Sequence, residues 1–324
     1  MPRRLISSTR SEIRTMTAKQ VKDSIRACEG RVILSQNYVG HSPLLEGTTN
    51  AELAESMGAD MVFFNGYPMD ETIEIPAFQV DVYKDGQYVH ESYRLKEMKT
   101  LTKGPLGVYL ECGVGDDPSA STSTQAGTSL IRRERVASDE NLKKLIDEDV
   151  DFVVLAGNPG TGTSMETIID ATKRAKAILG DQVMIWAGKW EDGVKEKVLG
   201  DPLRKDSKEV IAKLIDAGAD VICLPMPGSR TGVTVENMRE LVTFVHEYGD
   251  KSTLAMSFLD GSVEGSDEGT VRLCGLMSKQ TGADIHAIGD ASCSGMSTPE
   301  DIYQLAMTIK GRRLTWLKTA AGFR

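Results

Sequence analysis

The feature that most constrains the fold is a short internal repeat at the start of buried strands. Gly58-Ala59-Asp60, Gly218-Ala219-Asp220 and Gly282-Ala283-Asp284 each end an amphipathic stretch and open an apolar run, and Asp149-Val150-Asp151 is a weaker fourth copy. Glycine at the end of a helix readily adopts the left-handed conformation, and an apolar run that follows at once is typical of a buried strand. The repeat therefore predicts helices that lead directly into strands, with the aspartates as turn and cap residues.

Four further apolar runs alternate with these and bring the number of predicted strands to eight. The eight predicted strands cover residues 31–37, 61–65, 105–111, 152–158, 182–189, 221–225, 252–260 and 285–289. Helical patterns fill the intervals at 49–57, about 90–102, 138–147, 164–179, 207–216, 235–248, 267–281 and 299–310. This alternation favours a closed (β/α)8 TIM barrel over an open parallel sheet, because an open sheet leaves two edges unprotected. We expect residues 1–324 to form a single barrel domain.

Two segments lie outside the alternation. Residues 1–30 form an N-terminal extension, and its helix at 17–28, with a cap at Thr17, is suited to closing the bottom of the barrel. Residues 68–90 are an insertion after the second strand, within which 80–89 predicts a hairpin that turns at Asp85-Gly86. We expect this insertion beside the barrel mouth, either as a lid or as a dimer contact, and we expect the protein to form homo-oligomers.

Composition excludes several classes of partner. The 38 basic and 47 acidic residues give a formal charge of −9, which disfavours nucleic acid and anionic membranes. The five cysteines contain no C-x-x-C pair and fit neither a disulfide framework nor a zinc site. No apolar run approaches the length of a membrane span, and the first residues lack the apolar segment of a secretory signal. We therefore expect a cytoplasmic protein whose ligand is a small metabolite.

Three residues at strand ends are the candidate catalytic group. Active sites of such barrels lie at the carboxyl ends of the strands. Glu111, Lys189 and Asp260 end the third, fifth and seventh strands, so we expect them to converge over one mouth. Two carboxylates and an amine suit acid–base or Schiff-base chemistry. In the alternatives, Glu111 and Asp260 instead hold Mg²⁺ through hard oxygen ligands, or the three residues form a salt-bridged ring with no catalytic role.

The loops after strands four, six and eight contain residues suited to binding an anion. Residues 157–164 have the spacing of an ATP-binding P-loop, but Thr163 stands where the lysine must be, which excludes that site. Glycines beside a helix N-terminus still suit a phosphate or carboxylate, although they could serve only as turns. The candidate ligands are Asn37, Asn65, Asn158, Gly160, Gly162, Ser229, Arg230, Gly289, Ser292 and Ser294.

Six groups of short motifs support a family resemblance over nearly the whole chain. They are Gly30-Arg-Val-Ile-Leu-Ser35, Thr49-Asn-Ala-Glu52, Gly157-Asn-Pro-Gly-Thr-Gly162, Ala187-Gly-Lys189, Glu264-Gly-Ser-Asp-Glu268, and Ile288-Gly-Asp-Ala291 with Pro299-Glu-Asp-Ile302. With them the chain resembles a bacterial TIM-barrel family whose members often lie beside sugar phosphotransferase genes and carry the label "haloacid dehalogenase-like hydrolase". The resemblance implies the fold more than a reaction. Members have a histidine soon after the lysine motif, whereas this chain reads Lys189-Trp-Glu-Asp-Gly193.

These observations predict an enzyme that acts on a small phosphorylated sugar or keto acid by C–C cleavage or isomerisation. In this interpretation Lys189 polarises the carbonyl or forms an imine, Glu111 carries the proton, and the three loops hold the anion. Two alternatives stay open. One is a Mg²⁺-dependent lyase or hydrolase of a phosphorylated metabolite, and the other is a barrel that binds a sugar phosphate without turnover.

Overall fold

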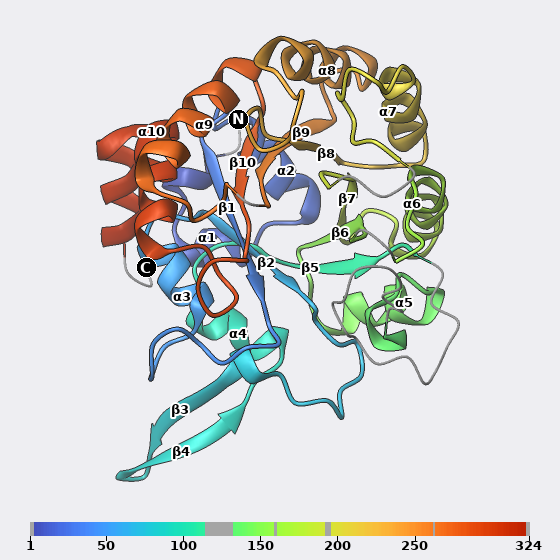
Figure 1. Ribbon diagram of the computed structural model, residues 1–324. Coiled ribbons are helices and arrows are strands. Elements are labelled where there is room, and N and C mark those ends of the chain that lie inside the picture. The colour runs from blue at the N-terminus through green and yellow to red at the C-terminus, as the bar shows by residue number, and fades with distance from the viewer. Residues whose placement is uncertain (1–2, 114–131, 159–160, 192–195, 262, 322–324) are drawn as a thin grey trace.

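The computed structural model describes residues 3–113, 132–158, 161–191, 196–261 and 263–321. In these ranges eight parallel strands close into a barrel (Figure 1). They are β1 (Val32–Tyr38), β2 (Met61–Asn65), β5 (Leu106–Glu111), β6 (Phe152–Ala156), β7 (Met184–Gly188), β8 (Val221–Pro225), β9 (Leu254–Leu259) and β10 (Ile285–Ile288). Because β1 pairs with both β2 and β10, the sheet has no edge. The predicted (β/α)8 fold is confirmed.

Helices alternate with the strands and form the outer layer of the barrel (Figure 1). They are α3 (Asn50–Ser56), α4 (Leu95–Leu101), α5 (Asp139–Asp147), α6 (Met165–Leu179), α7 (Ser207–Asp216), α8 (Val235–Tyr248), α9 (Glu268–Thr281) and α10 (Pro299–Ala320), with a short 3-10 helix, η3 (Arg133–Arg135), before α5. The predicted helix at 90–102 starts too early, because Ser92 still belongs to a strand. The predicted end at 310 corresponds to the kink at Gly311, where φ is 73°, and a second helical stretch of α10 continues from there to Ala320.

Side chains along each strand point alternately into the barrel and toward the helices. On β7, Met184 and Trp186 join the interior cluster, and Trp186 stacks on Phe152 with ring centroids 4.3 Å apart. Ile185 and Ala187 join the other cluster, between strands and helices. This alternation decides which residues at the strand ends reach the mouth of the barrel.

The aspartates of the repeat link neighbouring strands at the bottom of the barrel. Each accepts a hydrogen bond from the backbone N–H of a residue at the start of the adjacent strand. The pairs are Asp60 with Ile33 (2.9 Å), Asp151 with Leu106 (2.7 Å), Asp220 with Ile185 (3.0 Å) and Asp284 with Ala255 (2.8 Å). The expected structural role of these aspartates is therefore confirmed, in the form of side-chain bonds between strands.

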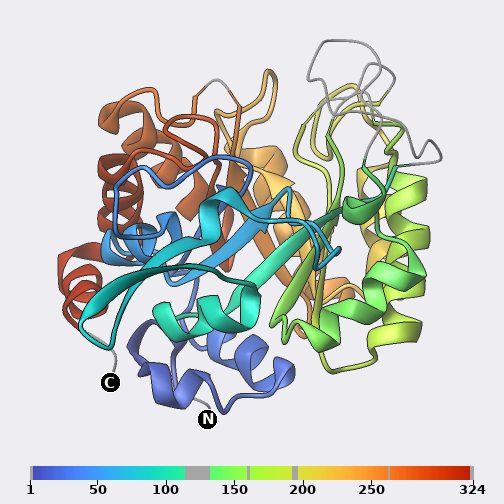
Figure 2. The ribbon, with the colours of Figure 1, turned by 90° about the horizontal axis from the view of Figure 1, so that it is seen from below.

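The N-terminal extension closes this end of the barrel. It contains η1 (Leu5–Ser7), α1 (Arg10–Ile13) and α2 (Ala18–Arg26). Thr17 caps α2 as predicted, and Val21 and Ile25 of α2 pack into the interior cluster of the barrel. Figure 2 shows these helices, in dark blue, beneath one end of the barrel. Within the described ranges, no helix combines the length and the apolar character required to cross a membrane.

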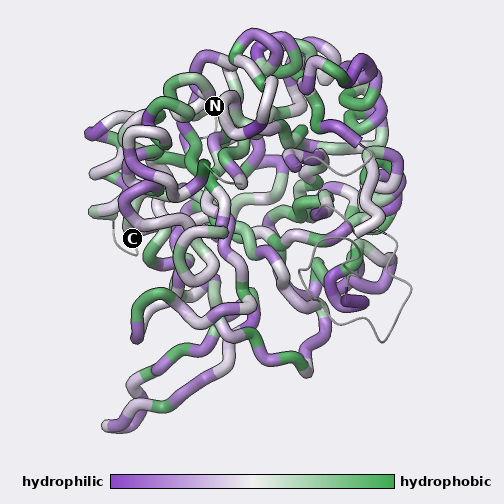
Figure 3. The backbone as a smooth tube through the Cα atoms, viewed as in Figure 1, coloured by the Kyte–Doolittle hydropathy of each residue, from purple (hydrophilic) through white to green (hydrophobic). Residues whose placement is uncertain are grey.

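The insertion after β2 forms an arm beside the barrel. After η2 (Pro76–Phe78), β3 (Gln79–Lys84) and β4 (Gln87–Ser92) pair as an antiparallel hairpin, and we call residues 79–92 the arm. The predicted turn is confirmed, with φ of 51° at Asp85 and 87° at Gly86. The arm extends away from the barrel (Figure 1), lies along its side (Figure 2) and carries mostly hydrophilic residues (Figure 3). This position does not place the arm over the mouth.

Candidate functional site

Two of the three predicted catalytic residues meet inside the barrel mouth. Glu111 ends β5 on the same face as Tyr109, and Asp260 follows β9 on the same face as Phe258. Burial raises the pKa of Tyr109 well above its usual value, and the charges of Glu111, Glu191 and Asp260 raise it further. All three carboxylates therefore act on one phenol at the mouth. The expected convergence holds for Glu111 and Asp260.

Glu111 is a buried carboxylate fixed by one neighbour. Its Oε1 accepts a hydrogen bond from Nδ2 of Asn158 at 2.6 Å, and its Oε2 accepts from the backbone N–H of Asn158 at 3.1 Å. Burial raises the pKa of Glu111 to about 7, although the bonds from Asn158 act in the opposite direction. Such a group can exchange a proton at neutral pH. Asn158, predicted as an anion ligand, here positions the carboxylate.

Lys189 does not join them, and the prediction that it converges with the two acids is wrong. Ile185 and Ala187 face the helices, and Lys189, two residues further along the chain, faces the same way. It is 2% exposed, and its Nζ lies 3.2 Å from Oε2 of Glu196. That carboxylate also accepts the backbone N–H of Met165, the first residue of α6. The ammonium therefore lies in the layer between strands and helices, because β7 exposes alternate residues on opposite faces.

Three acidic residues that sequence reasoning did not select enlarge the site. Desolvation raises the pKa of Glu191, and the charge of Asp260 adds to this effect. The pKa of Glu264 is raised well above its usual range by burial and then by Asp260 and Asp290. Burial raises the pKa of Asp290 to about 6. Asp290 directly follows the predicted eighth strand, so its place at the mouth could be found from the sequence, whereas nothing in the sequence pattern placed Glu264 there.

Arg230 supplies a positive charge at this site. Its Nε donates to the backbone oxygen of Trp190 at 2.9 Å, and one terminal nitrogen lies 3.1 Å from Glu191 and 3.5 Å from Asp260. Trp190 packs edge-on against Phe258, with ring centroids 4.6 Å apart. The expected placement of Arg230 at the mouth holds. Its charge is, however, already paired with the carboxylates of Glu191 and Asp260, so it is not free to pair with a ligand only.

The other predicted anion ligands use their donors within the fold. The hydroxyls of Ser229, Ser292 and Ser294 donate to the backbone oxygens of Met226 (2.7 Å), Glu264 (3.3 Å) and Ser42 (2.9 Å). The N–H of Gly289 donates to Leu259 O at 2.9 Å. Gly162 adopts φ of 74°, as a tight turn requires, and Gly160 lies outside the described residues. Binding of an anion by these loops stays a prediction.

The amides at the ends of β1 and β2 divide between the two faces. Asn65 reaches the mouth, where its Nδ2 donates to Asp290 Oδ2 at 3.1 Å. Asn37 pairs in register with Phe64, which belongs to the helix-facing cluster, and donates to the backbone oxygen of Gln36. The prediction that Asn37 reaches the mouth is wrong by one residue. Gln36 occupies that place and bonds to Asp290.

The alternative from the sequence, in which Glu111 and Asp260 together hold Mg²⁺, stays a prediction. Both oxygens of Glu111 accept from Asn158, whereas Asp260 lies toward Arg230 and Glu264. Across the described ranges, no three histidine, cysteine, aspartate or glutamate side chains are arranged to enclose a metal ion by themselves. A cation at this mouth would therefore need amide or water oxygens as well as carboxylates.

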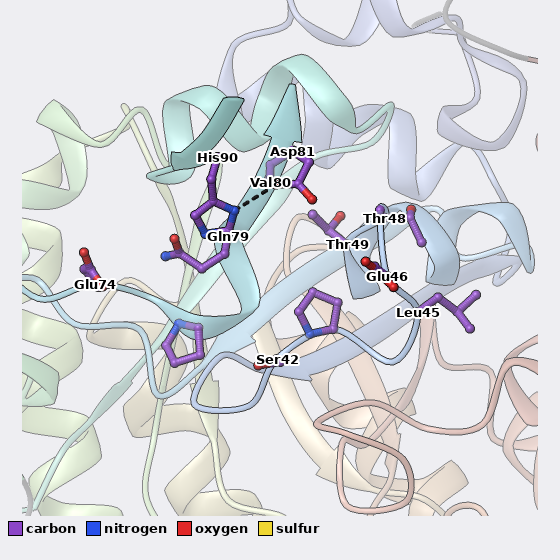
Figure 4. A pocket seen from close by; sticks show the side chains of 13 residues that line it. Ser42, Leu45, Glu46, Thr48, Thr49, Glu74, Gln79, Val80, Asp81 and His90 are labelled. Atoms are coloured by element: carbon purple, nitrogen blue, oxygen red, sulfur yellow. Dashed lines mark hydrogen bonds and ion pairs between the residues drawn. The ribbon is translucent and has the colours of Figure 1, made fainter. Parts of the chain in front are cut away.

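A separate cavity of about 580 Å³ lies between the arm and the loop that follows β1 (Figure 4). Nδ1 of His90 and Oδ1 of Asp81 are 2.9 Å apart on the arm and line this cavity together with Glu46 and Glu74. These side chains sit at the base of the arm, outside the barrel. The buried acids with raised pKa values lie in the mouth and not in this cavity, so we take the mouth as the candidate site.

The sequence family of the chain is shown by a single match. The model described as "Domain of unknown function (DUF7916)" matches residues 6–324, and the chain belongs to this family. No curated protein matches the chain in sequence.

Several solved structures are similar to the chain. They include an endo-β-1,4-mannanase from Thermotoga petrophila, with a TM-score of 0.51 and 14% identity over 89% of this chain and 79% of that one. The carboxyl transferase domain of Rhizobium etli pyruvate carboxylase follows at 0.49 and 11%, over 96% of this chain, which spans about half (51%) of that one. A Schiff-base-forming fructose-1,6-bisphosphate aldolase gives 0.48 and 14%, over 88% and 92%. At 14% identity, the likeness to the mannanase concerns the fold alone.

Proposed function

For this member of the family, we propose an acid–base lyase or isomerase that acts on a small keto acid or phosphorylated sugar. The observation that carries the proposal is Glu111, an inward-facing carboxyl with a pKa of about 7, both oxygens of which are held by Asn158. General bases work best when their pKa lies near the pH at which the enzyme operates. Glu111 is therefore suited to taking a proton from the carbon next to a carbonyl group.

The neighbours of Glu111 suit the charge that this reaction develops. When the base takes the C–H proton, the electron pair moves toward the carbonyl and forms an enolate oxygen. Tyr109, whose pKa stays far above neutral, keeps its proton and can donate it to that oxygen as a hydrogen bond. Where the deprotonated carbon carries a hydroxyl, transfer of that hydroxyl proton to the enolate oxygen and return of the C–H proton to the former carbonyl carbon complete an isomerisation. In a lyase, Glu111 instead takes the proton of the substrate hydroxyl on the carbon beyond the bond to be broken. The C–C bond then breaks, that carbon leaves as a carbonyl compound, and the carboxyl gives its proton to the enolate carbon.

Electrostatics favour a keto acid among the two substrate classes. A phosphate group carries about −1.5 to −2 charges at neutral pH, whereas a carboxylate carries one. At the mouth, Arg230 is already paired with Glu191 and Asp260. A single carboxylate bound at Arg230 meets less repulsion from these acids than a phosphate dianion does. Lys189, ion-paired with Glu196, supports no imine in this scheme.

The test is solvent exchange at the acidic carbon, because it needs no knowledge of the product. We would incubate the protein in D₂O with a panel of 2-keto acids and ketose phosphates and follow loss of the C–H signal by NMR. The Glu111→Gln variant should lower the exchange rate roughly 100- to 10,000-fold. The same change at Glu236, an exposed residue of α8, is the matched control.

Three results would count against the proposal. Exchange that persists in Glu111→Gln would remove the assigned base. A substrate that raises the melting temperature without any exchange would instead indicate a binding protein. Trapping of substrate on the protein by borohydride would restore an imine, which this scheme excludes.

A further inference from the structure

The inner layer of the barrel has a gap in its side chains at the mouth. One step beyond the last paired residues, the register places Gln36 of β1, Gly289 after β10 and Asp260 after β9 next to one another. The backbone bond from Gly289 to Leu259 shows that pairing continues at this level. Because Gly289 has no side chain, the space between Gln36 and Asp260 is open to another group.

The carboxylate of Glu264 enters this space from the loop after β9. A Cβ atom added at Gly289 would lie 1.5 Å from Oε2 of Glu264 and 2.9 Å from Oδ1 of Asp260. The backbone N–H of Ala291 holds the other oxygen of Glu264, Oε1, at 2.8 Å. Oε2 is thereby directed into the inner layer, beside Asp260.

Two buried acceptors in this layer lack a partner. Within the residues that the structure describes, neither Oε2 of Glu264 nor Oε1 of Gln36 accepts a hydrogen bond. The two residues are only 6% and 5% exposed. An unsatisfied buried acceptor costs roughly 1–3 kcal/mol. Two such oxygens beside a carboxylate match the chemistry of a hard cation, which is attracted by oxygen atoms and by negative charge.

We propose that Asp260, Glu264 and Gln36 bind one magnesium ion at the barrel mouth. Mg²⁺ commonly takes one or two carboxylates and keeps several waters, so a site of this kind needs no third acidic ligand. Arg230 approaches Oδ2 of Asp260 at 3.5 Å, which leaves Oδ1 on the side of Glu264. Asp290, held by Asn65, adds negative charge behind the ligands. This site differs from the alternative from the sequence, in which Glu111 and Asp260 hold the ion.

Ion binding is measured without substrate, so this inference stands or fails separately from the proposed reaction. We would titrate the full-length protein with Mn²⁺, follow the free ion by electron paramagnetic resonance, and displace it with Mg²⁺. The wild type should bind one Mn²⁺ per chain. Glu264→Gln and Asp260→Asn should each weaken binding at least roughly tenfold, whereas Glu236→Gln should bind as the wild type does.

The alternative is a protonated Glu264 that donates a hydrogen bond to Asp260 with no ion present. In that case Glu264→Gln, which keeps a donor, would retain its stability, and the wild type would show no saturable Mn²⁺ binding at millimolar concentration. Either no saturable site in the wild type or full binding by a folded Glu264→Gln would overturn the proposal. Circular dichroism on each variant establishes that it is folded.

Discussion

At Gly289, one methyl group would occupy the position that the Glu264 carboxylate fills. The glycine has no positive φ, so alanine is compatible with the backbone and the conflict is steric alone. The nearest atom, Glu264 Oε2, is held in place through Oε1 by Ala291. Gly289 is therefore required because it has no side chain, and not because of its backbone conformation.

We expect Gly289→Ala to lower the free energy of unfolding by about 1–3 kcal/mol, as overpacking does, and to weaken Mn²⁺ binding. The added methyl must displace the carboxylate of Glu264. Removing that carboxylate as well, in Gly289→Ala with Glu264→Ala, should recover part of the lost stability but not the ion binding. Urea unfolding of the two single variants and the double variant measures this coupling. Additive losses in the double variant would show that the two groups do not compete for one space.

At the scale of elements, the four aspartates of the repeat link strands in pairs and tie each pair to a basic side chain. Asp60, Asp151, Asp220 and Asp284 lie within hydrogen-bond distance of Lys310 (2.7 Å), Lys99 (3.0 Å), Lys22 (2.6 Å) and His246 (2.8 Å). In the same order, these basic side chains belong to α10, α4, α2 and α8. One motif therefore fixes the strand register and also anchors the surrounding helices.

The His246–Asp284 pair should make stability depend on pH. The hydrogen bond to Asp284 raises the pKa of His246 above its usual value of 6.5, although partial burial opposes this. A raised pKa in the folded state means that the stabilisation is complete below about pH 6.5 and is lost as pH rises through the folded pKa. Because the pair is partly exposed, we expect a loss of under about 1 kcal/mol.

Urea unfolding between pH 5.5 and 8.5 tests this pair. The wild type should lose stability over the upper part of that range, and His246→Gln should show a flatter curve. His41→Gln, at an exposed position near the mouth, is the control and should keep the slope of the wild type. Equal slopes in all three proteins would mean that the pair contributes nothing to folding.

At the scale of the whole molecule, the barrel is closed below by α1 and α2 and carries its acids at the opposite end, while the arm stands to one side (Figures 1 and 2). The arm exposes two tyrosine rings that meet edge to face, with Tyr83 64% and Tyr88 76% exposed. Its ends are joined by a hydrogen bond of 3.0 Å from Tyr93 N to Phe78 O. A lid would have to reach over the mouth, so this position favours the contact between copies over the lid.

Replacing residues 79–92 by a short glycine–serine linker should leave the barrel folded. The hydrogen-bonded ends already lie together, so the free energy of unfolding should change by no more than about 1 kcal/mol. Mn²⁺ binding should also be unchanged, because no residue of the arm belongs to the proposed site. Altered ion binding or solvent exchange in the shortened protein would support the lid. Light scattering on the same samples shows whether the arm joins copies in a homo-oligomer.

The sequence by itself determined the barrel, because eight apolar runs and a repeated Gly-Ala-Asp motif mark the strands and the helix ends, and these are local features that the fold keeps. It also placed Glu111, Asp260 and Arg230 at the mouth, since strand ends can be read from where apolar runs stop. It did not determine the facing of Lys189 or Asn37, because a shift of one residue turns a side chain from the interior to the helices. Only the tertiary structure brought Glu264 from its loop into the space left by Gly289, since that contact depends on the closure of β9, β10 and β1 around one axis.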